Sequence, residues 1–152
     1  MITLTLIGGL LTAAAFSVVV IASWRVHPEV WVGDITKGEE KTEPTPANIS
    51  WFLAVMVTMV VGTAATAWVA VVDFDAGFFQ RFVVAWCVMA IVSLVDLVVI
   101  DIVIFMWWRP ASLTLEGYDI PLEYRMHVVG ALKGLFYGVP IALVAAAVSA
   151  LA

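Results

Sequence analysis

The chain is poor in charge and in cysteine. Only 12% of its 152 residues are Asp, Glu, Lys or Arg, whereas a soluble domain carries about 25%. Cys87 is the one cysteine, which excludes an intramolecular disulfide and a cysteine metal cluster. The chain has no basic patch for neutralising phosphates, so we expect no nucleic-acid partner. Apolar residues make up 64% of the chain, so the expected surrounding is a lipid bilayer.

The motifs of several common enzyme classes are also absent. The sequence contains no GxSxG, no HExxH, no P-loop and no GxGxxG. An enzyme is therefore not the favoured interpretation, and no cofactor is expected.

Long apolar runs are what the chain does have. A membrane-spanning helix needs about 20 apolar residues, and every backbone amide in lipid must be bonded internally. Period-two alternation, the pattern of a membrane barrel, is missing. The sequence therefore predicts an all-α four-helix transmembrane bundle, one domain over residues 1–152. The expected helices are 2–24, 51–72, 82–108 and 121–151, with polar loops at 25–50 and 109–120.

The positive charges favour one orientation. They gather in or next to the two longer loops, at Arg25, Lys37, Lys41, Arg109 and Arg125. The short link at 73–81 carries only Arg81, and the two ends of the chain carry none. Because Lys and Arg favour the cytoplasmic side, we expect both longer loops inside. Both termini would then lie outside a bacterial plasma (inner) membrane.

The third run contains two aspartates, Asp96 and Asp101. A charge in the middle of a membrane helix costs about 2.5–3.5 kcal/mol on insertion scales. Asp101 and Lys133 lie at similar depths of two antiparallel helices, so we predict an ion pair between them. Alternatively, Lys133 extends its long side chain to the membrane surface.

Asp96 lies five residues deeper, which in an α-helix turns it about 140° from Asp101. No cation matches its depth, so we predict that Asp96 is protonated and donates a hydrogen bond to a neighbouring helix. Ser93 lies one turn earlier on its face. Hydroxyl partners are available at Thr12, Thr58, Thr63 and Thr66. The alternative is a proton or cation relay, since ionisable groups inside a membrane are often functional.

Small residues recur every fourth position in the last run. They are Gly130, Gly134, Gly138, Ala142, Ala146 and Ala150. Small residues let membrane helices approach closely, so this row predicts close packing. Its partner can be another helix of this chain, a second copy or another membrane protein.

A metal site on the inner side is a weaker hypothesis. Glu123 and His127 are four residues apart and share a helix face, and His27 is the other histidine. Ligands at that spacing can share a metal. The same residues also fit a solvated acidic surface with one salt link.

Three stretches together are similar to a family of small bacterial four-helix membrane proteins. They are "HPEVWVGDITKGEEKTEPTP", "SLVDLVVIDIVIFMWWRP" and "EGYDIPLEYRMHVVGALKG". The matching positions are His27, Pro28, Trp31, Asp34, Asp96, Asp101, Gly117, Tyr118, His127, Lys133 and Gly134. The chain departs from the family in having Ile102 where a Trp is expected and no aromatic after Asp34. The resemblance implies four helices and bacterial origin, and it brings no assigned activity.

Three functions remain open. The favoured one is a non-catalytic packing, assembly or accessory protein that uses the small-residue row. The second is a small transporter or channel for protons or cations built around Asp96. The third is a small membrane enzyme or metal binder on the inner acidic and histidine face.

Overall fold

The fold is the all-α four-helix bundle that the apolar runs predict. The computed structural model describes residues 1–26, 46–72, 76–111, 113 and 124–151. The helices in these residues are α1 (Ile2–Val26), α3 (Pro46–Val71), α4 (Phe78–Val95), the π-helix η1 (Asp96–Trp108) and α5 (Tyr124–Leu151). Together α4 and η1 form one continuous rod. Four segments are long and apolar enough to cross a membrane, which makes this a multi-pass membrane protein: Ile2–Val26, Pro46–Val71, Phe78–Trp108 and His127–Leu151.

Two helices begin earlier than the apolar pattern predicts. α3 starts at Pro46 rather than at residue 51, and proline suits a first turn because the early amides lack helical partners anyway. α4 starts at Phe78 rather than at residue 82, and the Gly77 N–H donates to the Gln80 side chain at 2.8 Å. Such a contact satisfies an otherwise unpaired amide. The expected start of the last helix at residue 121 lies outside the described residues.

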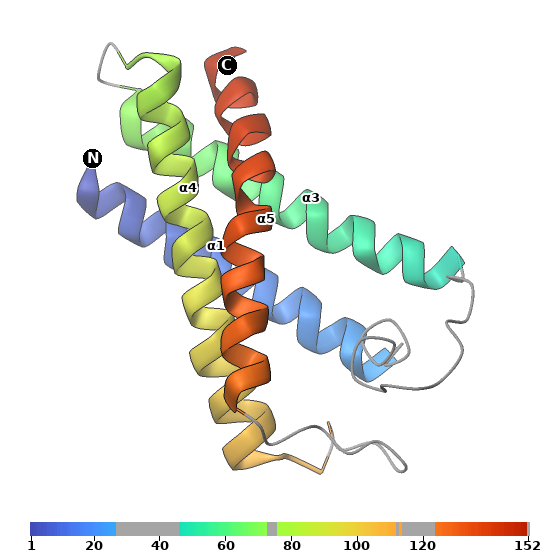
Figure 1. Cartoon of the computed structure of the whole chain (residues 1–152). Helices are drawn as coiled ribbons and strands as arrows, with labels where there is room; N and C mark the ends of the chain where they lie inside the picture. The colour runs from blue at the N-terminus through green and yellow to red at the C-terminus, as the bar shows by residue number, and fades with distance from the viewer. Residues whose placement is uncertain (27–45, 73–75, 112, 114–123, 152) are drawn as a thin grey trace.

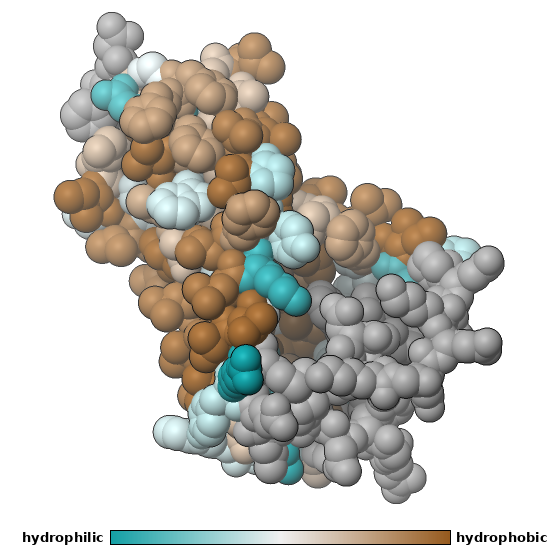
Figure 2. All heavy atoms as spheres, viewed as in Figure 1, coloured by the Kyte–Doolittle hydropathy of each residue, from teal (hydrophilic) through white to brown (hydrophobic). Residues whose placement is uncertain are grey.

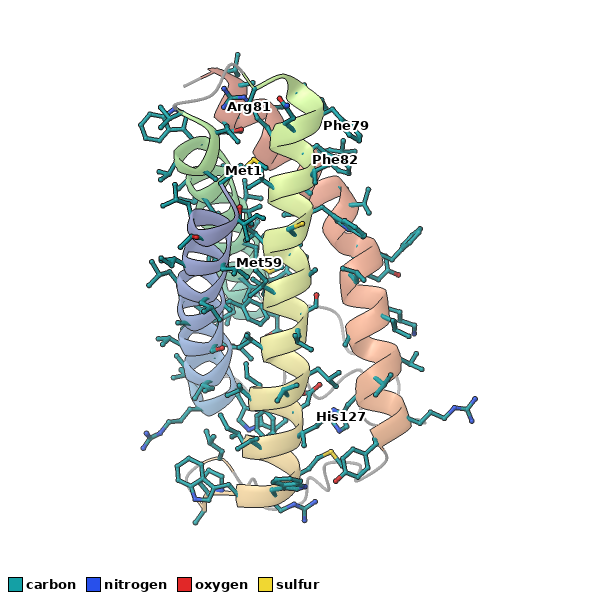
Figure 3. All side chains as sticks on the ribbon, turned by 90° about the vertical axis from the view of Figure 1, so that its left-hand side faces the viewer. Met1, Met59, Phe79, Arg81, Phe82 and His127 are labelled. Carbon is teal, nitrogen blue, oxygen red and sulfur yellow. The ribbon has the colours of Figure 1, made fainter. Side chains whose placement is uncertain are left out.

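The helices form two pairs that cross (Figure 1). α1 packs beside α3, the rod of α4 and η1 packs beside α5, and each pair also contacts the other. The pairs lie together at the end that holds both termini and diverge toward the opposite end (Figures 1 and 3). His127 lies at this diverging end, whereas Met1 and Arg81 lie at the end of the termini (Figure 3).

The α1–α3 pair is held by two reciprocal glycine–threonine contacts. A Cβ atom at Gly8 would overlap the Thr66 side chain, and one at Gly62 would lie 2.8 Å from the Thr12 methyl. Each threonine hydroxyl donates to the carbonyl of the glycine one turn earlier in its own helix, at 2.8 Å in both cases. The two backbones therefore approach closely without leaving a hydroxyl unpaired in lipid.

The α4–α5 pair uses part of the small-residue row. A Cβ atom at Gly138 would lie 3.1 Å from Met89 of α4, and Ala142 and Ala146 are fully buried. A Cβ atom at Gly134 would lie 3.6 Å from the Ser93 hydroxyl, while nothing lies within 4 Å of one at Gly130. The middle of the row therefore packs inside this chain.

Polar contacts tie the ends of the bundle. At the end of the termini, Arg81 of α4 donates to the Ser149 carbonyl in the last turn of α5 at 2.7 Å, which satisfies a carbonyl that the helix leaves unpaired. At the other end, the Trp24 indole donates to the Leu113 carbonyl at 3.0 Å and its ring packs 4.9 Å from that of Phe105. Trp24 is thus a core residue of the chain.

The outer surface fits a lipid surrounding. In the space-filling view, apolar side chains cover most of the visible face of α4 and α5, and strongly hydrophilic ones are few (Figure 2). Trp107 and Trp108 are exposed at the end of the rod, and the Trp107 indole donates to the Tyr124 hydroxyl at 3.1 Å. Exposed indoles at a helix end are typical of the headgroup layer.

Candidate functional site: two carboxylates and a histidine between η1 and α5

The two membrane aspartates lie on a π-helix. α4 changes to η1 at Asp96, and Asp101 lies five residues further along. At the end of η1, the Arg109 N–H donates to the Ile104 carbonyl, five residues back, at 2.8 Å, and Arg109 has the left-handed φ of 45°. π-helices are rare, are mostly a single turn, and occur often at functional sites. A π-helix that begins at a membrane carboxylate therefore singles out this segment.

The π-helix has more residues per turn than an α-helix, and this changes the directions in which the two carboxylates point. In an α-helix, residues five apart differ by about 140°. In η1 the backbone hydrogen bond itself spans five residues, so Asp96 and Asp101 point much closer to one direction. Asp96 is close enough to Asp101 and to His127 to feel the charge of both. The expected rotation of about 140° between the two aspartates assumed an α-helix and therefore does not apply to η1.

The ionic partner of Asp101 is His127 of α5 and not the expected Lys133. His127 Nδ1 lies 3.1 Å from Asp101 Oδ2, and the side chains are only 15% and 25% exposed. The histidine points from α5 toward η1 (Figure 3). Lys133 lies six residues further on, about 120° away around the helix, and is exposed on the outside of α5. The partner of Asp101 therefore depends on which residues of α5 face η1, and not only on how deep they lie in the membrane.

Asp96 does not form the expected hydrogen bond to a hydroxyl of the first two membrane helices. The candidate hydroxyls have other partners: Thr12, Thr58 and Thr66 donate to carbonyls of their own helices, and Thr63 donates to the Met89 sulfur. Within the described part of the chain, every fully buried side-chain N or O atom has a hydrogen-bond partner. The half-buried carboxyl of Asp96 forms no hydrogen bond there, so it keeps some accessible surface.

The membrane half beyond Asp96 is closely packed, and its described residues include no Asp, Glu or His. Val88, Met89 and Val92 of α4 are buried almost completely, as is Ala145 of α5. Ser93 is half-buried and faces Gly134. The polar row of Asp96, Asp101 and His127 therefore runs from the interior of the bundle toward the diverging end only.

The metal hypothesis gains no support from the described residues. His27 and Glu123 lie outside them, and His127 is engaged with Asp101. Among the residues that the structure describes, no group of three His, Cys, Asp or Glu side chains could hold a metal ion.

Sequence reasoning found Asp96, Asp101 and Ser93 but missed the role of His127 in this row. The available signal was its position at the start of the last run, level with the end of the third. Gly8 was missed too, although Gly8 and Thr12 repeat the spacing of Gly62 and Thr66.

The Asp101–His127 pair predicts a coupled effect on stability. His127→Leu leaves the Asp101 carboxylate without its ionic partner, and we expect a loss of about 3 kcal/mol, the lower end for broken buried pairs, because both side chains keep some exposure. Adding Asp101→Leu should recover most of this loss, and Lys133→Gln should have little effect. SDS unfolding in mixed micelles measures these three variants and Asp101→Leu alone. Single effects that simply add would show that the two residues are uncoupled.

Comparisons with known proteins return nothing: no family model, no curated protein and no solved structure matches this chain. The geometry of the site therefore carries the functional argument by itself.

Proposed function

We propose that this protein is a proton-linked membrane carrier in which Asp96 binds the proton. The observation that carries the proposal is the row formed by Asp96, Asp101 and His127 between η1 and α5. Titratable groups are rare inside membrane helices, and chains of Asp and His there are typical of proton relays. The family resemblance adds a bacterial origin to the proposal and no chemistry.

Each member of the row has a distinct part in the relay. His127 is the entry group, because it lies at the diverging end of the bundle and its imidazole can both accept and donate a proton. With Asp101 accepting a hydrogen bond from Nδ1–H, a proton taken up at Nε2 releases the Nδ1 proton to Asp101. Asp101 then passes this proton to Asp96, directly or through a bridging water. The half-buried Asp96 carboxyl, which has no hydrogen bond of its own among the described residues, receives it.

The closed half of the bundle favours a carrier over an open channel. The described helices are tightly packed beyond Asp96 and carry no further carboxylate or histidine there, so a proton that reaches Asp96 has no further group of the relay to pass to. Release on the other side then needs a change of helix packing. The π-helix is the natural place for that change, because conversion of η1 to an α-helix would turn the two aspartates apart.

A packing or assembly role was the favoured interpretation of the sequence, and the structure weakens its basis. Gly138, Ala142 and Ala146 are used within the chain. Of the six small residues in the row, only Gly130 and Ala150 are exposed. Two separate positions are too few to define a surface for a partner.

Proton movement across vesicles tests the proposal. The purified chain is reconstituted into vesicles that contain a pH-sensitive dye, and a potassium diffusion potential drives protons inward. We expect acidification of the lumen well above that of protein-free vesicles. Rates equal to those of protein-free vesicles, for a protein shown to be folded and inserted, would overturn the carrier and favour an assembly protein.

The relay also needs a defined orientation, and we propose that the diverging end faces the cytoplasm, as the positive charges indicate. In a Cys87→Ala background, a cysteine at Ala76 should react with a membrane-impermeant thiol reagent in intact cells. Cysteines at Thr42 and Ser112 should react only after the membrane is opened. The reverse pattern of labelling would show that His127 faces outside.

A further inference from the structure

Lys133 carries a charge inside a membrane-spanning segment, and it forms no hydrogen bond or ion pair with the other described residues. It is six residues beyond His127, the first residue of the α5 span, and so about 9 Å inside that span at 1.5 Å per residue. Gly134, its neighbour, faces Ser93 of α4, which places Lys133 at least as deep as Asp96. The side chain is nevertheless exposed, on the face of α5 opposite its buried residues. An ammonium group at this depth is stabilised by an anion or by reaching the membrane surface.

In a second copy of this chain, the carboxylates of the described helices are poor candidates for that anion. Among the residues that the structure describes, Asp96 and Asp101 are the only carboxylates. Both are half-buried, and Asp101 is held by His127. A neighbouring copy could not present either of them to the outside of α5 without giving up the contacts of its own α5.

The local shape of α5 points instead to the near membrane surface. Side chains on a helix lean toward its N-terminus, and the N-terminal end of α5 is the one nearer to Lys133. Gly130 lies one turn in that direction on the same side, and no atom lies within 4 Å of a Cβ atom there. This open space at Gly130, called the Gly130 notch below, leaves room for the flexible lysine stem to turn toward the membrane surface. Tyr137, one turn deeper, is exposed beside it.

We infer that Lys133 and the Gly130 notch form a binding site for the phosphate of an anionic phospholipid. The ammonium group binds the phosphate from the hydrocarbon side of the headgroup layer. One acyl chain lies over the apolar outer face of α5 near Phe136, which is 75% exposed. The pairing removes the isolated charge from hydrocarbon. This site is separate from the proposed proton row, which lies on the inner face of the same helix.

Lipid binding by matched variants tests the inference. The full chain in neutral detergent micelles is titrated with phosphatidylglycerol or phosphatidylcholine, and bound lipid is counted by native mass spectrometry. A basic group near an anionic surface contributes about fivefold to affinity, so Lys133→Gln should weaken phosphatidylglycerol binding about fivefold and leave phosphatidylcholine binding unchanged. Lys133→Arg should bind as the original chain does.

A second variant separates a built site from general attraction between charges. Gly130→Leu keeps every charge and fills the notch, and a lipid-facing leucine suits a helix, so the fold should persist. We expect it to weaken phosphatidylglycerol binding as well. Unchanged binding by Lys133→Gln would overturn the inference, and so would unchanged binding by Gly130→Leu. A dimer in neutral micelles that Lys133→Gln dissociates would also overturn it, because the anion would then come from a protein.

Discussion

Replacing Asp96 with Asn should abolish proton uptake by vesicles while leaving the bundle folded. Asparagine has nearly the shape of aspartate but cannot take up and release a proton. A side chain that transfers protons typically contributes a factor of 10²–10⁴ in rate, so we expect a fall of about a hundredfold, in practice to the level of protein-free vesicles. Stability should change little, because Asp96 forms no hydrogen bond within the described residues.

The matched control is Thr58→Val. Thr58 is another half-buried polar residue of a membrane helix, and its hydroxyl donates only to the Ala54 carbonyl of its own helix at 2.8 Å. The Thr58→Val variant should keep the proton flux of the original chain. Flux that survives in Asp96→Asn would remove Asp96 from the relay, even if the protein moves protons by another route.

Placing a methyl group on Gly8 should produce the largest loss of stability among single-methyl changes at the helix contacts. The added Cβ atom would overlap the Thr66 methyl and hydroxyl at once. Overpacking of this kind typically costs about 1–3 kcal/mol. The two helices cannot relax apart cheaply, because the second contact, between Gly62 and Thr12, holds the same pair together.

Two companion variants make the Gly8→Ala result specific. Gly130→Ala adds the same methyl group in open space, and it should leave stability unchanged or raise it by up to about 1 kcal/mol, because alanine is the better helix former. Combining Gly8→Ala with Thr66→Ala removes the two nearest obstructing atoms and should restore much of the loss. SDS unfolding in mixed micelles measures the three. Equal stability of Gly8→Ala and Gly130→Ala would contradict the close approach of α1 and α3.

The sequence by itself determined the class of the protein and the number of membrane-spanning helices that the structure describes. Lipid offers no hydrogen-bond partner to the backbone, so each apolar run of about 20 residues has to become a helix, whatever it packs against. It also identified Asp96 and Asp101 as exceptional, because carboxylates are costly in hydrocarbon wherever they point.

Only the tertiary structure decided which groups meet. Depth along a helix can be counted from the sequence, and it made Lys133 a plausible partner for Asp101. The direction of a side chain around the helix also depends on how the helices are rotated against each other and on the local helix type. The π-helix brought Asp96 and Asp101 toward one side, and the rotation of α5 turned His127 inward and Lys133 outward. These rotations are set by the packing of all four helices, which no single stretch of the sequence encodes.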